Sequence, residues 1–139
     1  MFCDAPGCGA GTCEPVGPVA NETPDEVPVC GCDGATYWNA SVALSHGMAV
    51  QGSGECANSP ICGGFGGIQC DAGLSCNYGG KSIQICNIAD GTGVCWGLPA
   101  TCPQIVIGPQ THACNGACQE KCALIKQGIA FYDDPTCPQ

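Results

Sequence analysis

The stretch Val29-Cys-Gly-Cys-Asp-Gly-Ala-Thr-Tyr-Trp-Asn-Ala-Ser41, which continues to Cys56, has the most regular pattern in this chain. Asp33-Gly34 predicts a tight turn, and the β-branched and aromatic residues after it predict a hairpin strand. Asn39 is placed to cap a short helix, and Gly47 stands where a helix C-terminus takes a left-handed residue. The stretch therefore predicts a hairpin, one short helix and a strand that returns toward the closing cysteine.

Residues 29–56 resemble a Kazal domain in its compact form, C-G-x-D-G-x-T-Y-x-N-x-C followed by a Gly-hydrophobic-x-hydrophobic run and a final G-x-C. In that family the loop-closing cysteine bonds to the last cysteine, so the resemblance implies a disulfide between Cys30 and Cys56. One departure is clear, because Ser41 stands where the family has its helix cysteine and Ser45 where a further one would be. The family's cross-linking scheme therefore cannot be transferred whole.

The C-terminal third repeats this stretch. Fifteen residues separate Ser41 from Cys56, fifteen also separate Cys122 from Cys137, and the superposition places Gly47 on Gly128. The run from Cys114 to Cys122 lacks the Kazal hairpin motif, so we expect a second module that is Kazal-like by repeat and not by motif.

By the same resemblance, the second module should contain two disulfides. The repeat implies Cys114–Cys137, and the retained helix cysteine implies Cys102–Cys122.

Between the two lies a segment rich in glycine and cysteine. The run from Cys62 to Cys76 has a C-G-G-x-x-G-x-x-C-x-x-G-L-x-C pattern that resembles small modules often found before Kazal-like domains. Its available core residues are Phe65, Ile68 and Leu74. A hairpin turn is predicted at 78–81 and a strand at 82–86.

Composition places the chain among small disulfide-rich proteins. Sixteen cysteines in 139 residues predict eight disulfides and no free thiol, while 33 glycines and prolines predict loops and short elements. We expect tandem Kazal-like α+β modules, each a short hairpin plus one short helix, joined by a cysteine-rich loop/β module. The predicted domains are 1–56, with a long Pro-rich loop, 57–94 and 95–139. An oxidising, extracellular location follows.

Charge excludes one class of partner. The net charge is −9, and Lys81, Lys121 and Lys126 are the only strongly basic residues, which leaves no basic patch for nucleic acid. No apolar run has the length of a membrane span, and we expect no signal peptide before Phe2-Cys3. Few bonds are open to trypsin-like proteases, so we also expect resistance to them.

Two groups of side chains are candidates for chemistry. Cys114, Cys118 and Cys122 are spaced to share a helix face beside His112, which would suit a soft metal ion. An oxidising compartment instead favours three disulfides, each to a different loop, so we predict no metal site. No nucleophile motif accompanies His46 or His112, and we expect neither a cofactor nor an enzymatic activity.

The Pro-rich loop at 14–29 is expected to be extended and held only at its ends. Two candidate glycosylation sites, Asn21 and Asn39, lie in Asn-x-Ser/Thr triplets.

Two functions remain. Kazal domains commonly inhibit serine proteases through a loop whose contact residue lies two positions after the opening cysteine. The resemblance places Pro15 there in the first module and Gln104, followed by Ile105, in the Cys102–Ile107 loop of the second. The long first loop loses the rigidity that gives such inhibitors their affinity, so inhibition is the alternative hypothesis.

The favoured hypothesis is a secreted structural protein of an extracellular surface, matrix or filament that binds copies of itself. Modules this small bury little apolar surface, so some large side chains should remain partly exposed as contacts. The candidates are Phe2, Trp38, Trp96, Phe131 and Tyr132. A contact between the N-terminal cysteines of one copy and the C-terminal module of the next would be heterologous and would build open filaments.

Overall fold

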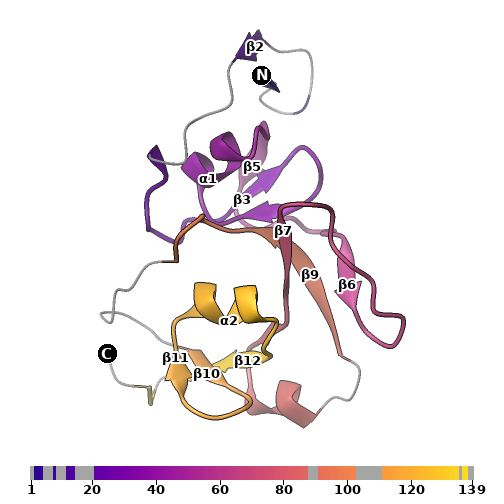
Figure 1. Ribbon diagram of the computed structural model, residues 1–139, viewed down its shortest axis with the longest axis vertical. Helices are drawn as coiled ribbons and strands as arrows, with labels where there is room; N and C mark the ends of the chain where they lie inside the picture. Colours follow the sequence, from indigo (N-terminus) through magenta and orange to yellow (C-terminus); the bar gives the residue numbers. More distant parts are fainter. Residues whose placement is uncertain are drawn as a thin grey trace.

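The computed structural model describes residues 2–4, 8, 12–14, 21–87, 91–102, 111–134 and 136–137 (Figure 1). Three sheets contain its strands. The first sheet pairs β1 (Phe2–Asp4) with β2 (Thr12–Glu14). The second has the strand order β5 (Val50–Ser53), β3 (Val29–Gly31), β4 (Thr36–Tyr37), β9 (Thr92–Gly97) and β6 (Ile61–Gly63), and β7 (Leu74–Asn77) also pairs with β9. The third has the order β11 (Cys118–Gln119), β10 (Thr111–Ala113), β12 (Phe131–Asp133) and β8 (Gly79–Gly80). The short helices are α1 (Ala40–Ser45) and α2 (Lys121–Gln127), and a 3₁₀ helix spans Ile83–Asn87.

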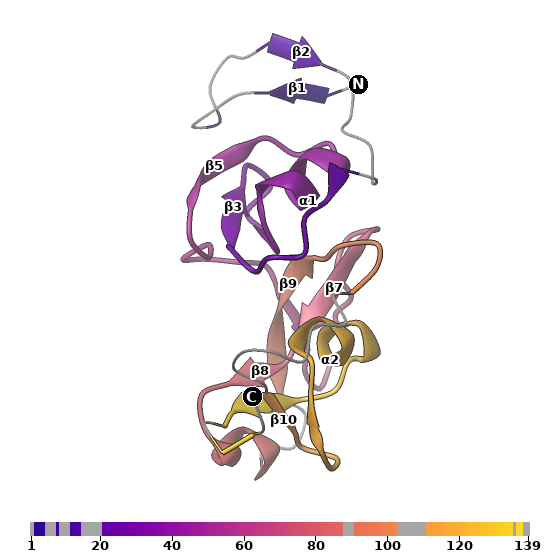
Figure 2. The same ribbon diagram turned by 90° about the vertical axis from the view of Figure 1, so that its left-hand side faces the viewer.

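The sequence repeat is also a structural repeat. The first copy consists of β3, β4, α1 and β5, and the second of β10, β11, α2 and β12. Val29 pairs with Tyr37 across the first hairpin, and Thr111 pairs with Gln119 across the second. Both residues of the second pair lie 82 positions after their counterparts in the first. Figure 2 places the two copies at different levels of the long axis, with the β1–β2 sheet at the end beyond the first.

Backbone hydrogen bonds repeat with the strands. Four bonds of the first copy recur in the second with donor and acceptor shifted by 81 or 82 positions: Gly31 N to Ala35 O and Ala113 N to Ala117 O, Cys32 N to Ala49 O and Cys114 N to Ala130 O, Gly47 N to Leu44 O and Gly128 N to Ile125 O, and Met48 N to Ala43 O and Ile129 N to Leu124 O. The second copy therefore keeps the hairpin although its sequence lacks the hairpin motif. Asn115-Gly116 occupies the turn that Asp33-Gly34 makes in the first.

The cap at Asn39 and the glycine after each helix agree with the prediction from the sequence. Asn39 caps α1, its side chain accepting a hydrogen bond from Val42 N, and Gly47 follows the helix with φ of 70°. Glu120 caps α2, and Gly128 ends it with φ of 69°. A left-handed glycine lets the chain leave each helix and return as a strand beside the hairpin.

One hydrophobic cluster is shared by both copies and the segment between them. Strand β4 pairs in parallel with β9, and this brings Trp38 into edge contact with Trp96, with ring centroids 6.2 Å apart. Phe131 joins the same cluster from β12. The expectation that these three side chains are exposed contacts is wrong: each is at most 2% exposed. The modules bury their large side chains against one another, and the boundaries at 56 and 94 stay a prediction.

The middle segment differs from expectation in two places. The sequence predicts Phe65, Ile68 and Leu74 as core residues, but Phe65 and Ile68 are exposed, and of the three Leu74 alone packs against the main cluster. Residues 82–86, predicted as a strand, fall largely in the 3₁₀ helix, and Gly79–Gly80 pairs in parallel with β12 rather than turning a hairpin. The pairing of Gly79 with β12 requires glycine, because a Cβ on Gly79 would lie 2.5 Å from the Phe131 ring.

Disulfides hold these short elements together. Seven join described cysteines: Cys8–Cys32, Cys30–Cys56, Cys62–Cys76, Cys70–Cys95, Cys86–Cys114, Cys102–Cys122 and Cys118–Cys137. Cys30–Cys56 and Cys102–Cys122 are pairs that the Kazal resemblance implied. No free cysteine occurs among the described residues.

The third implied pair, Cys114–Cys137, is wrong. Cys114 bonds to Cys86, and Cys137 bonds to Cys118. The error came from aligning Cys114 with the first cysteine of the Kazal motif. Its structural counterpart is Cys32, whose partner likewise lies upstream of its copy.

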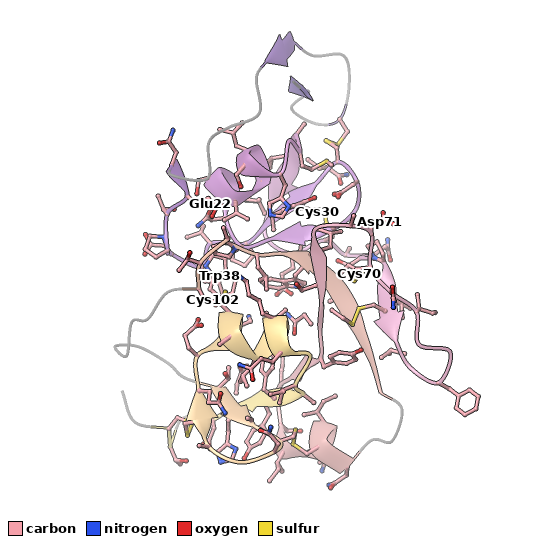
Figure 3. The ribbon with its side chains drawn as sticks, viewed as in Figure 1. Glu22, Cys30, Trp38, Cys70, Asp71 and Cys102 are labelled. Atoms are coloured by element: carbon pink, nitrogen blue, oxygen red, sulfur yellow. A yellow bond between two sulfur atoms is a disulfide. The ribbon has the colours of Figure 1, made fainter. Side chains whose placement is uncertain are left out.

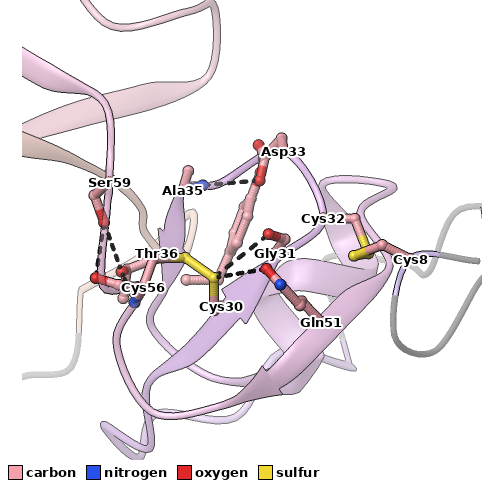
Figure 4. Close-up of a disulfide and its surroundings, with 11 residues drawn as sticks. Cys8, Cys30, Gly31, Cys32, Asp33, Ala35, Thr36, Gln51, Cys56 and Ser59 are labelled. Atoms are coloured by element: carbon pink, nitrogen blue, oxygen red, sulfur yellow. Dashed lines mark hydrogen bonds between the residues drawn. A yellow bond between two sulfur atoms is a disulfide. The ribbon is translucent and has the colours of Figure 1, made fainter.

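Substitution at two facing positions explains why the last cysteine changes partner. In the first copy Cys30 lies opposite Thr36, and the Thr36 hydroxyl accepts a hydrogen bond from Cys56 N at 3.0 Å (Figure 4). In the second copy these positions are His112 and Cys118. In the second copy the last cysteine, Cys137, therefore bonds to Cys118 on the other strand of the hairpin, β11.

Candidate interaction surface

The predicted inhibitory residues, Gln104 and Ile105, lie outside the described residues. Phe2 belongs to β1, and its side chain is also outside the description, while Tyr132 is partly exposed and stacks on His112 with ring centroids 5.1 Å apart. Of the two candidate glycosylation sites, Asn21 is exposed, whereas Asn39 is 4% exposed.

Asn39 is occupied by structural hydrogen bonds. Its Nδ2 donates to the carbonyl oxygens of Thr23 and Asp25, both at 2.8 Å, and to the Thr23 hydroxyl at 3.1 Å. An amide nitrogen engaged in this way is closed to a glycosyl donor in the folded chain.

The described part of the Pro-rich loop, residues 21–28, is attached along its length. Thr23 N donates to the Ser41 hydroxyl at 2.9 Å, the Trp38 indole donates to Pro24 O, and Val27 N donates to Trp38 O. The loop is therefore not held only at its ends. Ser41 holds it to helix α1 by hydrogen bonds, at the position where the second copy uses the disulfide of Cys122.

This equivalence leads to a prediction. The hydroxyl oxygens of Thr23 and Ser41 are 3.3 Å apart, so the double variant Thr23→Cys, Ser41→Cys should form a new disulfide. The new link should raise the free energy of unfolding by about 1–3 kcal/mol, because it closes a short loop and so restricts the unfolded chain. Peptide mapping without reductant and the denaturant midpoint measure it. The double variant Thr23→Ser, Ser41→Ala is the control without a cross-link. Two free thiols in the folded cysteine variant would contradict the equivalence.

A cleft of about 340 Å³ beside α1 gathers polar side chains that could suggest chemistry. Within it the Ser45 hydroxyl donates to Glu22, whose other oxygen accepts from Ala100 N at 2.9 Å. His46 Nε2 lies 3.1 Å from Leu98 O, and Lys126 Nζ donates to Ala100 O. Each of these groups has a structural partner. Glu22 and His46 join the Pro-rich loop and the first copy to the segment after β9, and Lys126 joins α2 to the same segment.

Three described clusters bring potential metal ligands together. In one of them, His112, Cys118 and Asp134 have ligand atoms within 4.8 Å of one another, but the sulfur is bonded to Cys137. The Asp134 carboxylate accepts two hydrogen bonds from Thr136, and these lower the pKa of that carboxyl. As predicted from the sequence, Cys114, Cys118 and Cys122 each bond to a different segment.

An exposed apolar surface lies on the hairpin that begins with β6. We call residues 61–70 the Phe65 arm, and it projects from the side of the molecule (Figure 1). Gly63 and Ile68 exchange two backbone hydrogen bonds, of 2.7 and 3.1 Å, and Gly67 N donates to Gly64 O across the tip. Three glycines in the turn have positive φ, a conformation that other residues rarely adopt.

Disulfides fix both ends of the arm. Cys62 bonds to Cys76 on β7, and Cys70 bonds to Cys95 on β9. Phe65, at the tip, is 93% exposed, and Ile61 and Ile68 are each more than half exposed. The arm thus presents a phenyl ring on a short, cross-linked support. The sequence contained the signal for this, since an aromatic residue between pairs of glycines has few neighbours to bury it.

An open pocket of about 360 Å³ lies at the root of the arm. Ile68, Leu74 and Tyr78 provide apolar surface, and Gln69 lies at the lining as well. Tyr78 packs so closely on Gly63 that a Cβ there would overlap its ring. The root of the arm, β7 and Tyr78 therefore form the pocket.

No protein-family model, curated protein or solved structure matches this chain. Among the described residues, neither helix has the length and apolar character that crossing a membrane requires.

Proposed function

We propose that this chain is a secreted, non-catalytic structural protein of an extracellular surface, matrix or filament, and that it works by binding copies of itself. The observation that carries the proposal is the Phe65 arm, a cross-linked hairpin that holds an almost fully exposed phenyl ring on an acidic chain. Exposed apolar groups gathered on one surface commonly mark a contact site.

The disulfides support the extracellular assignment. Seven of them among the described residues would not persist in a reducing cytosol. They also stabilise a fold of short elements that an uncross-linked chain of this composition would not sustain. Such stabilisation suits a protein that must last outside the cell.

We further propose that both copies are Kazal-like. In its support, each contains a hairpin, one short helix and a returning strand, and each joins its last cysteine to the hairpin. Cys102–Cys122 also ties the segment before the second copy to its helix. That link favours the alternative function, a serine protease inhibitor that acts through the Cys102–Ile107 loop.

Sedimentation of the purified chain over a range of concentration and salt tests the proposal. Because the net charge of −9 opposes contact between copies, association should strengthen as salt screens it and as falling pH protonates the carboxylates. A chain that stays monomeric under all these conditions contradicts self-association. If that monomer also forms a tight complex with a subtilisin-like protease, the inhibitor alternative replaces it.

A further inference from the structure

We propose that Asn115 is a site of spontaneous chemical modification, at which the side-chain amide is lost and an aspartate or isoaspartate remains. Asn115 and Gly116 form the exposed tip of the hairpin that joins β10 to β11. The inference goes beyond the proposed function and does not depend on self-association. It begins from a difference between the two copies, whose equivalent turns hold the side chain at this position differently.

In the first copy the side chain at this position is held in place. Asp33 Oδ1 accepts a hydrogen bond from Ala35 N at 3.1 Å, and Asp33 Oδ2 accepts one from the Tyr37 hydroxyl at 2.7 Å. Gly34 N, the next backbone nitrogen along the chain, donates to Gly31 O at 2.9 Å. The Asp33 carboxyl group is therefore fixed by two donors and is not free to rotate toward the Gly34 nitrogen.

The second copy lacks this arrangement. Gln119 stands 82 positions after Tyr37, at the equivalent place in the hairpin, so the hydroxyl donor is absent. Within the part of the chain that the structure describes, the Asn115 side chain makes no hydrogen bond. Gly116 N donates to Ala113 O at 3.2 Å, a longer bond than its counterpart in the first copy. The Asn115 amide is therefore free to approach the Gly116 nitrogen when that single bond opens.

Cross-links keep the hairpin folded around this exposed tip. The cysteine immediately before Asn115 bonds to Cys86, and Cys118 on β11 bonds to Cys137. Figure 3 shows the β10–β11 hairpin at the lower end of the second copy, away from Trp38. Water and dissolved bases therefore reach the tip without unfolding of the hairpin.

The reaction needs only these two residues, a base in solution and water. Gly116 N gives up its proton to the base and attacks the Asn115 side-chain carbonyl carbon. The bond from that carbon to Nδ2 breaks, Nδ2 leaves as ammonia with a proton from water, and a cyclic imide forms. Water then opens the ring at either carbonyl and gives aspartate or isoaspartate.

The identity of the second residue decides how readily the ring closes. Glycine has no Cβ, so its backbone reaches conformations in which its nitrogen meets the side-chain carbon of Asn115. The attack is also intramolecular, and correct placement of two reacting groups is a large part of the barrier to such a reaction. Each event adds one carboxylate to a chain of net charge −9, and the isoaspartate product inserts a methylene group into the backbone beside the disulfide to Cys86. The modified fraction therefore records the age of the chain.

The test uses the full, oxidised chain, incubated in mildly alkaline buffer and then analysed by mass spectrometry of its peptides. We expect Asn115 to lose its amide at least about tenfold faster than Asn58, which is also exposed but precedes Ser59. Isoaspartate at position 115 distinguishes the cyclic route from direct hydrolysis, which gives aspartate alone. This comparison needs no variant, because Asn58 is a control within the same molecule.

Gly116→Ala tests the attacking residue. A Cβ at this position would meet nothing within 4 Å, so the variant should fold with the same disulfides. We expect it to slow the loss of the Asn115 amide about tenfold or more, because a small displacement of the attacking nitrogen reduces the rate steeply. Peptide mapping without reductant confirms the disulfides of the variant.

Asp33→Asn tests the contribution of the structure, because it places the same dipeptide in the first turn. There Ala35 N and the Tyr37 hydroxyl are positioned to hold the side chain. In the folded chain we expect this position to convert at least about tenfold more slowly than Asn115. Reduction and unfolding of the variant should remove the difference between the two sites.

Three outcomes would overturn the inference. Asn115 could keep its amide as long as Asn58 does, or Gly116→Ala could leave the rate at Asn115 unchanged. In the third, Asp33→Asn converts as fast as Asn115 in the folded chain, and the lost hydrogen bonds of the second turn then do not create the site. None of these results bears on self-association, which sedimentation tests separately.

Discussion

Gly97→Ala will destabilise the folded chain by about 3 kcal/mol, whereas Gly52→Ala will change its stability by less than about 1 kcal/mol. Gly97 pairs with Tyr37 between strands β9 and β4, and a Cβ there would overlap the Tyr37 ring. The ring cannot move aside, because its hydroxyl donates to Asp33 at 2.7 Å and its edge contacts His46.

Gly52 is the matched control, because it also lies in a strand and a Cβ there would meet nothing within 4 Å. Denaturant titration with disulfides intact compares the two variants. Equal midpoints would show that the junction of β4 and β9 can absorb a methyl group, and the shared core described above would then be looser than its burial indicates.

Asn39→Asp is expected to lower stability by about 3–5 kcal/mol at pH 7. The wild-type Nδ2 donates to three oxygens, and a carboxylate oxygen in its place would face those same acceptors in a buried site. The capping bond to Val42 N would remain, so the loss reports on the attachment of the Pro-rich loop.

The pH dependence of this variant has a definite sign. Burial and the facing oxygens raise the pKa of the introduced carboxyl in the folded chain, so the penalty is largest above that pKa and shrinks as the pH falls and the carboxyl is protonated. The difference from the unmodified chain should thus be smaller at pH 3 than at pH 7. Asn58→Asp, at an exposed site, should show neither effect, and similar behaviour of the two variants would contradict the buried network.

Local signals in the sequence predicted local structure well. The cap at Asn39 and the glycine after each helix depend on interactions within a few positions. The repeat by 81 residues is the same local pattern occurring twice, and the structure contains all three features. The turn at Asn115-Gly116 was missed because the second copy was aligned by its cysteines and not by its turn. With the turn as anchor, Cys114 falls on Cys32 and the erroneous disulfide does not arise.

Longer-range features could not be predicted in the same way. The pairing of β4 with β9 joins residues 60 positions apart, Thr36 and Trp96, and no periodicity within either segment indicates it. The burial of Trp38 follows from that pairing and was therefore missed as well. Phe65 shows the opposite error, since it was predicted to be buried and is exposed. The scarcity of apolar residues suggested that the ring belongs to a core, but the glycines around it leave it nothing to pack against.

The order of the disulfides along the chain determines how a single cut in the backbone would behave. From Cys8 to Cys56, and again from Cys62 to Cys137, every peptide bond lies inside at least one disulfide loop. All three lysines lie within the second of these spans. A nick by trypsin would therefore leave both fragments covalently joined, and between Cys8 and Cys137 only cleavage in the short linker from Cys56 to Cys62 could separate the chain into two pieces.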